Sequence, residues 1–240
     1  MFMGYMPDLM EIILKIFSLE RNEQFFSRLQ KLSLGEITEF NIECVTALLG
    51  ILAKNTTKIN ALKLKAFCSN YNQRLLPALI CIIKSQEQLR KFRLIGEENF
   101  TIEFNGIISS LECQIKSLQE VKIESCICNT EFKVLNNCKN LRILRIHDCG
   151  NLNILEASLK TLEITCYPIY TPSIVPILKK SGTLLQRLKL SSFSTREMSL
   201  LPETLKSFCP NITYLNLTEV KFSTQFFELI VIYKNFNFLL

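Results

Sequence analysis

The sequence predicts an α/β solenoid in which a parallel sheet lines one side and helices cover the other. Two stretches carry this prediction, Leu118–Cys126 and Leu141–Cys149, because both follow the pattern L-x-x-L-x-L-x-x-C with Val or Ile in some Leu positions. The segment between them, Thr130–Cys138, has apolar residues at helical spacing. A strand phrase, a short helix and a second strand phrase at a regular period are typical of leucine-rich repeats, which build curved horseshoes with the sheet on the concave face.

The strand phrase recurs along the chain, and successive phrases start 30, 30, 29, 23, 18, 26 and 27 residues apart. Most of these steps lie near the roughly 20–29 residues of this repeat class. The phrases begin at Leu29, Ile59, Leu89, Leu118, Leu141, Leu159, Leu185 and Ile212. The residues eight places after each start are Ile37, Phe67, Glu97, Cys126, Cys149, Tyr167, Phe193 and Val220, and only Glu97 is neither apolar nor aromatic. This column predicts a shared core position.

The segments between the strand phrases predict helices on the convex side, because their apolar residues fall on one face of a 3.6-residue period. The expected helices are Asn41–Lys54, Leu75–Lys84, Phe104–Ile115, Glu131–Asn137, Ile174–Lys179, Met198–Phe208 and Gln225–Tyr233. Pro77, Pro176 and Pro202 occur early in three of them. A missing amide N–H is tolerated there.

A repeat array exposes an apolar face at each end unless another segment covers it. Residues 1–28 are therefore expected to form an N-terminal helical cap, with Pro7–Leu19 as its apolar helix. Residues 29–240 form the repeat array, of eight or nine repeats. Because Asn235–Leu240 reads as the start of a ninth strand phrase, we expect the array to be truncated at its C-terminus, as a fragment or a shortened gene product.

Composition predicts an ordered chain in a reducing compartment. The hydrophobic fraction is 48%, Gly and Pro number only 7 each, and no apolar run reaches the ~20 residues of a membrane span. Several of the 10 Cys fall at core positions, where a reduced thiol acts as a small hydrophobe. No signal peptide is evident at the N-terminus, so we expect a cytoplasmic or nuclear location. The sequons at Asn55, Asn99, Asn211 and Asn216 leave a secreted, glycosylated protein as an alternative.

No reaction chemistry can be assigned from the sequence. The only histidine, His147, has Asp148 beside it, but its position favours a surface residue of the sheet over a catalytic one. Cys126 and Cys128 do not supply the four ligands of a zinc site, and Cys126 is accounted for as a core residue. The glycine-rich, nucleophile and metalloprotease motifs are missing from the sequence. We therefore expect no enzyme activity, no cofactor and no bound metal.

The concave face is expected to carry a basic stripe. Because side chains alternate along a strand, the residues two and four places after each phrase start point away from the core. Eight of these sixteen residues are basic and two are acidic. The predicted partner-binding residues are Lys31, Lys63, Lys91, Arg93, Lys122, Arg145, Arg187, Lys189 and Tyr214. The stripe suits an acidic or phosphorylated segment of a target protein, or alternatively is an ordinary solvated face. Nucleic acid is the least favoured partner, since Tyr214 alone could stack on bases.

Two junctions resemble a known family. The segment Ile174–Leu190 passes from a helix through Ser-Gly into L-x-x-L-x-L, and Leu205–Leu217 passes through Cys-Pro-Asn-Ile into x-x-L-x-L. Together they resemble the leucine-rich-repeat (RNI-like) region of F-box proteins, especially an expanded fungal type. The resemblance covers about residues 25–240. It implies the substrate-receptor part of a cullin-RING ubiquitin ligase of the SCF type.

The N-terminal helix is similar to the opening of an F-box, Leu-Pro-x-Glu-Leu-x-x-x-Ile-Leu, which in that family binds Skp1. Here Met6 replaces the first Leu, and the spacing after Pro7 is one residue short. The helix is therefore either a plain cap or a degenerate F-box remnant. If it is a remnant, the residues that would contact Skp1 are Pro7, Leu9, Ile12, Ile13 and Ile16.

The sequence thus predicts a substrate adaptor that holds a target protein on its concave face and presents it to a ubiquitin ligase. The alternative is a ligase-independent repeat scaffold for protein–protein interaction, or a truncated family member without function. The predicted partners are a target protein and Skp1 with its cullin ligase, and we expect no membrane association.

Overall fold

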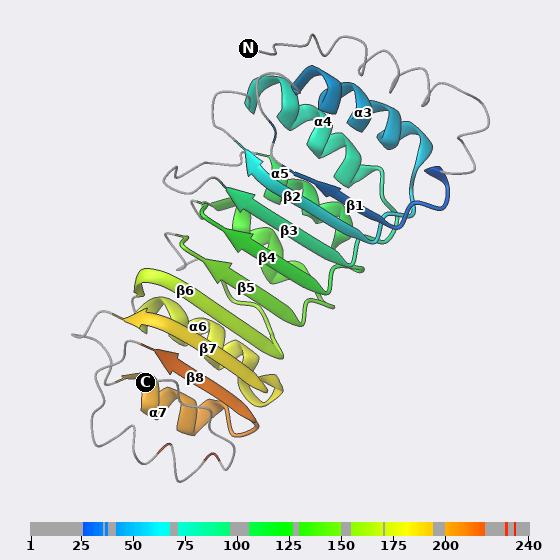
Figure 1. Ribbon diagram of the computed structural model, residues 1–240. Coiled ribbons are helices and arrows are strands. Elements are labelled where there is room, and N and C mark those ends of the chain that lie inside the picture. Colours follow the sequence, from blue (N-terminus) through cyan, green and yellow to red (C-terminus); the bar gives the residue numbers. More distant parts are fainter. Residues whose placement is uncertain are drawn as a thin grey trace, which may run out of the picture.

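A computed structural model describes residues 26–35, 37, 42–67, 72–96, 106–126, 130–149, 155–169, 171–193, 200–218, 229 and 233. In these ranges the chain forms an eight-stranded parallel sheet whose strands lie in sequence order (Figure 1). The strands are β1 (Lys31–Leu34), β2 (Ala61–Phe67), β3 (Lys91–Gly96), β4 (Glu120–Glu124), β5 (Ile143–His147), β6 (Thr161–Ile169), β7 (Arg187–Phe193) and β8 (Tyr214–Thr218). Each strand lies in one of the eight predicted phrases, so the α/β fold with a parallel sheet is confirmed.

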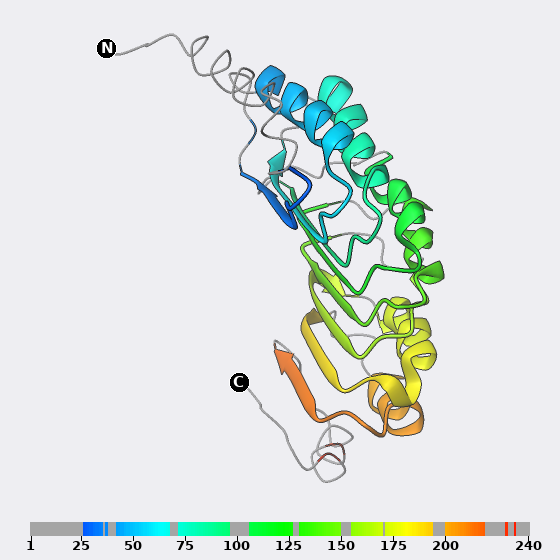
Figure 2. The same cartoon turned by 90° about the vertical axis from the view of Figure 1, so that its right-hand side faces the viewer.

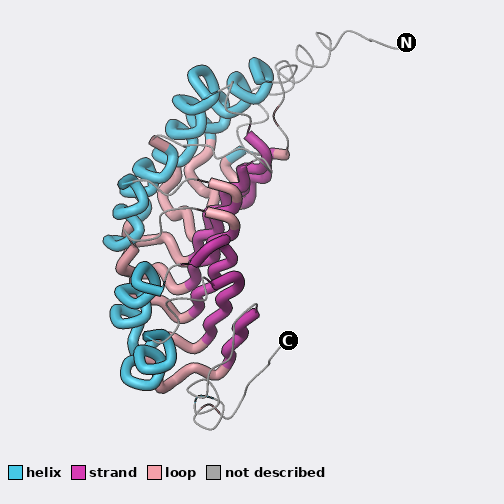
Figure 3. The backbone as a smooth tube through the Cα atoms, turned by 90° about the vertical axis from the view of Figure 1, so that its left-hand side faces the viewer, coloured by secondary structure: helices cyan, strands magenta, loops and turns pink. Residues whose placement is uncertain are grey.

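Helices alternate with the strands in the described ranges. They are α3 (Ile42–Asn55), α4 (Asn72–Lys84), α5 (Ile107–Ser110), α6 (Thr171–Ser181) and α7 (Leu200–Phe208), with 3₁₀ helices η3 (Leu111–Gln114), η4 (Thr130–Asn137) and η6 (Gly182–Leu184). Figures 2 and 3 show the helices along the outer side of a curved sheet and the strands along its inner side. The inner side is called the concave face below. No helix in the described ranges is long and apolar enough to cross a lipid bilayer.

Two helices begin earlier than predicted. Helix α4 starts at Asn72 and α6 at Thr171, so Pro77 and Pro176 lie inside these helices and not at their first turns. A proline there removes one backbone hydrogen bond of the helix. The burial of apolar side chains beyond the proline, such as Leu79 and Ile82 in α4, offsets that loss. The expected helix Gln225–Tyr233 and the expected cap Pro7–Leu19 lie outside the described residues, apart from residues 229 and 233.

The core lies between the sheet and the helices. The strand residues three and five places after each phrase start face the helices, as Leu62 and Leu64 do in β2. All of them are buried except Leu32, which is half-buried. Of the column eight places after each start, the described side chains are Ile37, Cys126 and Cys149, and all three are buried. The strand residues between the core positions therefore face the concave side.

Buried polar side chains fix the spacing between repeats. Three of them, Gln86, Gln114 and Ser181, stand three or four residues before a strand phrase, and each accepts a hydrogen bond from the first backbone N–H of the preceding phrase. The bonds run from Ile59 N–H to Gln86 Oε1 (2.9 Å), from Leu89 N–H to Gln114 Oε1 (3.0 Å) and from Leu159 N–H to Ser181 Oγ (3.1 Å). These N–H groups would otherwise be buried without a partner, which is costly.

Candidate binding surface

The concave face consists of three rows of side chains that run across the strands. The first row lies two places after each phrase start, the second row four places and the third row six places. Backbone pairing aligns each row: Lys31 pairs with Ala61 and Ala61 with Lys91, and the register continues to Tyr214 in β8. Neighbouring parallel strands are about 4.8 Å apart. Side chains of one row on adjacent strands are therefore within reach of one another.

All nine predicted partner-binding residues lie in the first two rows. The first row is Lys31, Ala61, Lys91, Glu120, Ile143, Thr161, Arg187 and Tyr214, and the second row is Ser33, Lys63, Arg93, Lys122, Arg145, Glu163, Lys189 and Asn216. Lys31, Lys91 and Arg187 are exposed, and the other six predicted residues are half-buried. The second row places basic residues on four consecutive strands, β2 to β5. That these residues bind a partner remains a prediction.

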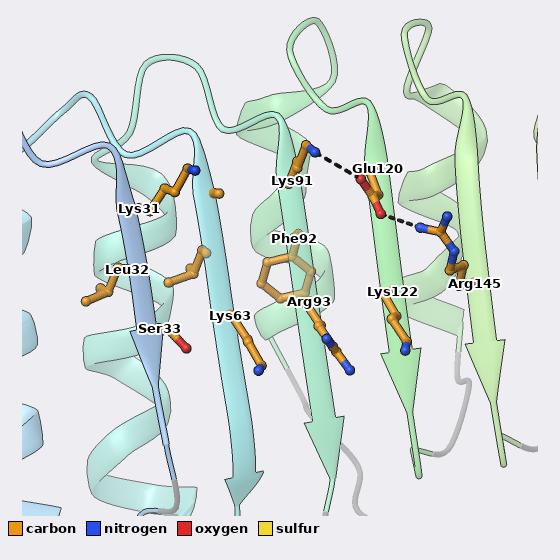
Figure 4. Close-up of a pocket in the computed structure, with 12 residues that line it drawn as sticks. Lys31, Leu32, Ser33, Lys63, Lys91, Phe92, Arg93, Glu120, Lys122 and Arg145 are labelled. Atoms are coloured by element: carbon orange, nitrogen blue, oxygen red, sulfur yellow. Dashed lines mark hydrogen bonds and ion pairs between the residues drawn. The ribbon is translucent and has the colours of Figure 1, made fainter.

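A groove of about 520 Å³ lies over this basic region of the concave face (Figure 4). Its lining comes from β1 to β5 and includes the charged residues Lys31, Lys63, Lys91, Arg93, Glu120, Lys122 and Arg145. The small side chains of Ser33 and Ala61 lie among the lysines and leave open space between them. Most of the charged side chains that line the groove are therefore basic.

Three carboxylates cross-link the cations in the middle of the sheet. Glu120 binds Lys91 at 3.5 Å and also pairs with Arg145 (Figure 4). Arg145 Nε in turn lies 3.0 Å from the Oε2 atom of Glu163. The acidic residues of the first two rows therefore do not lie apart from the basic stripe but neutralise part of it.

The third carboxylate, Glu124, was not among the residues that the sequence singled out. It lies in the third row, 3.3 Å from Arg93 and in contact with Lys122. Burial raises the pKa of Glu124, but the hydrogen bond from Lys122 and the charges of Lys122 and Arg93 outweigh burial and hold the pKa below its usual value. The sequence could have revealed Glu124, because side chains alternate along a strand and the residue six places after each phrase start also points away from the core.

Five cations of the concave face have no carboxylate partner among the described residues. They are Lys31, Lys63 and Lys65 on β1 and β2, and Arg187 and Lys189 on β7. Arg187 instead stacks on the ring of Tyr214, with its guanidinium carbon 4.2 Å from the ring centroid. A cation over an aromatic ring keeps its full charge. These five side chains can therefore pair with anionic groups of a partner.

His147 ends β5 in the third row, on the concave side as predicted. Burial lowers the pKa of His147, and the positive charge of Lys122 lowers it further. Its buried Nε2 atom has no hydrogen-bond partner within the described part of the chain. The Cys149 thiol, two residues along the chain, donates a hydrogen bond to the backbone carbonyl of His147 at 3.1 Å.

The described cysteines form no disulfide bond; they are Cys44, Cys81, Cys113, Cys126, Cys138, Cys149 and Cys209. Cys126 and Cys149 are neighbours, and the contact with Cys149 together with burial raises the pKa of Cys126. Burial raises the pKa of Cys138 and of Cys209 to about 11. Over the described ranges, no three His, Cys, Asp or Glu side chains are placed to hold a metal ion.

The residues proposed to contact Skp1, Pro7, Leu9, Ile12, Ile13 and Ile16, lie outside the described residues. No family model matches the sequence, and the search of curated proteins finds no match either.

Proposed function

We propose that the chain is a leucine-rich-repeat module that holds an acidic segment of a target protein on its concave face. The observation that carries the proposal is the groove of about 520 Å³ over β1 to β5, whose wall residues Lys31 and Lys63 have no carboxylate partner in the described structure. The sequential order of eight parallel strands supports the repeat assignment. The F-box resemblance of the helix-to-strand junctions agrees with it.

An acidic segment fits this surface for electrostatic reasons. Lysines that lack an intramolecular counterion gain a charge-assisted hydrogen bond when a carboxylate or phosphate arrives. Their summed field also raises the rate at which an acidic partner finds the face. The open groove leaves room for the main chain of a peptide between the lysines.

A polypeptide fits better than a nucleic acid. Single-stranded nucleic acids bind through several aromatic platforms, and in the first two rows only Tyr214 is aromatic. The ring of Tyr214 is already covered by Arg187. In the middle of the sheet, Glu120, Glu124 and Glu163 already pair with the cations that a continuous phosphate backbone would need.

The proposed role follows from the F-box resemblance: the module positions a target for ubiquitin transfer by a ligase that is recruited through Skp1, in the cytoplasm or nucleus. A repeat scaffold that works without a ligase would use the same surface. Co-purification of Skp1 with the natural full-length protein separates the two. Capture of Skp1 supports the ligase role, and its absence leaves the ligase-independent scaffold.

Binding itself is tested by fluorescence anisotropy with a labelled peptide of Glu and Ser and the 240-residue chain. The affinity should fall as salt is raised, because ions screen exposed charges. The double variant Lys31→Glu/Lys63→Glu should weaken binding by about tenfold or more. The matched control is Lys84→Glu/Lys133→Glu, which reverses two exposed lysines of α4 and η4 on the convex side. Equal losses in both variants, or tighter binding of single-stranded RNA than of the peptide, would contradict the proposal.

A further inference from the structure

The unneutralised positive charge of the concave face lies in two separate places. The first cluster is Lys31, Lys63 and Lys65 on β1 and β2, and the second cluster is Arg187 and Lys189 on β7. The strands between them carry the ion pairs of Glu120, Glu124 and Glu163. The face is therefore not one uniform stripe, as the sequence suggests, but two cationic clusters on either side of a middle whose cations are paired with carboxylates.

The middle of the face disfavours a third anionic contact. Arg145 is held by two carboxylates and Glu124 by two cations, so none of these groups is free for a partner. Beside them the first row continues with Ile143, which is half-buried, and Thr161, which is buried. An acidic side chain placed here would meet Glu163 and an uncharged surface. A neutral or apolar side chain fits this part better.

The distance between the clusters sets the length of the bound segment. From β2 to β7 there are five strand intervals, and at about 4.8 Å for each interval they span ~24 Å. An extended chain covers 3.3–3.6 Å per residue, so about seven residues bridge this distance. The curvature of the sheet shortens the path across its concave side, so seven is an upper value.

We propose that the target segment carries two anionic groups about five to seven residues apart, separated by uncharged residues and running across the strands. One group binds Lys31, Lys63 and Lys65, and the other binds Arg187 and Lys189. This inference rests on the proposed function, since it specifies the ligand of the same concave face. Binding at two tethered points raises affinity, because the second contact forms within the complex.

The test compares three synthetic peptides with equal length and equal numbers of Glu residues, measured by anisotropy at low salt. The first has two Glu clusters separated by about six Ser and Ala residues, the second has adjacent clusters, and the third has Glu spread evenly. The separated peptide should bind about tenfold or more tightly than the other two. Equal affinities for all three peptides would overturn the two-cluster inference but leave the proposed function standing.

Charge reversal assigns the contacts. Lys31→Glu/Lys63→Glu and Arg187→Glu/Lys189→Glu should each remove the advantage of the separated peptide, and Lys84→Glu/Lys133→Glu should keep it. Circular dichroism checks that each variant is folded. An advantage that survives reversal of the β7 cluster would overturn the inference. Failure of all three peptides to bind the unaltered chain would overturn the proposed function as well.

Discussion

The ammonium group of Lys91 on β3 lies 3.5 Å from the carboxylate of Glu120 on β4, across one strand interval of the concave face. Lys91 is 65% exposed and Glu120 23%, so the carboxylate is the better anchored partner. Glu120 also holds Arg145 on its other side. One acidic residue thus restrains two of the basic residues that the sequence assigned to partner binding.

Replacing Glu120 with Gln should therefore strengthen the binding of an acidic peptide. The substitution removes one negative charge and releases Lys91, and it frees Arg145 from one of its two carboxylates. We expect affinity to rise several-fold at low salt and the free energy of unfolding to change by less than about 1 kcal/mol. Anisotropy and urea unfolding measure the two effects. Glu112→Gln, an exposed position in η3, is the control. Weaker binding of the Glu120→Gln variant would contradict this prediction, because it would mean that the ion pairs of Glu120 help to bind the peptide.

Gln114 should be important for stability. Its side chain accepts a hydrogen bond from Leu89 N–H and donates one to the carbonyl of Gln86 at 2.7 Å. Gln114→Ala leaves both buried backbone groups without a partner, which should lower the free energy of unfolding by about 1–3 kcal/mol. Gln119→Ala, which truncates an exposed glutamine in the next phrase, should change it by less than ~0.5 kcal/mol. Equal effects in urea unfolding would contradict the structural role of Gln114.

His147 should make stability depend on pH below the usual pKa of histidine, about 6.5. Its folded pKa is lowered by burial and by Lys122, so it lies below the unfolded value of about 6.5. In this window the unfolded chain binds more protons, and stability should fall as the pH drops from about 6.5 through the folded pKa. Glu124, Glu163 and Lys189 also face the imidazole.

Because His147 is the only histidine in the sequence, the His147→Gln variant should flatten this part of the profile. Urea unfolding of both proteins at pH 7 and at pH 5 provides the measurement. A drop in stability of equal size in the variant would assign the pH dependence to carboxylates instead.

Thiol reactivity should divide the described cysteines into two classes. Cys81 and Cys113 are exposed and should react rapidly with a chromogenic disulfide reagent at neutral pH. Cys126 is buried beside Cys149 with a raised pKa, and burial raises the pKa of Cys209 to about 11, so both should react only on unfolding. Mass spectrometry of the labelled peptides identifies the sites. Rapid labelling of Cys126 in the native protein would contradict its place in the core.

The strands and their register could be predicted because the phrase repeats and its side chains alternate. Because side chains alternate, the position of the first Leu of a phrase, such as Leu118 or Leu141, determines which face each later side chain of that strand takes. The first residues of α4 and α6 were predicted too late in the chain. Packing of their apolar faces stabilises these helices enough to keep Pro77 and Pro176 inside them. Packing between repeats is a tertiary effect, and the spacing of apolar residues within one segment does not predict it.

The charge state of the concave face could be predicted only in part. Sequence gives the positions of Lys91 and Arg145, but it does not show that both side chains converge on Glu120. Gln86 and Gln114 were missed for a related reason: the backbone N–H groups that they bind belong to the preceding repeat, 27 and 25 residues earlier in the chain. Such contacts depend on how the repeats stack.

The placement of the target on the concave face is tested most directly by photocrosslinking. The separated-cluster peptide, with a benzophenone side chain between its two Glu clusters, is irradiated with the 240-residue chain, and the adducts are mapped by mass spectrometry. We expect adducts on the concave strands, at or beside Arg145 and Ile143, that disappear when unlabelled peptide competes. Specific adducts confined to the outer helices α3 and α4 would contradict binding on the concave face.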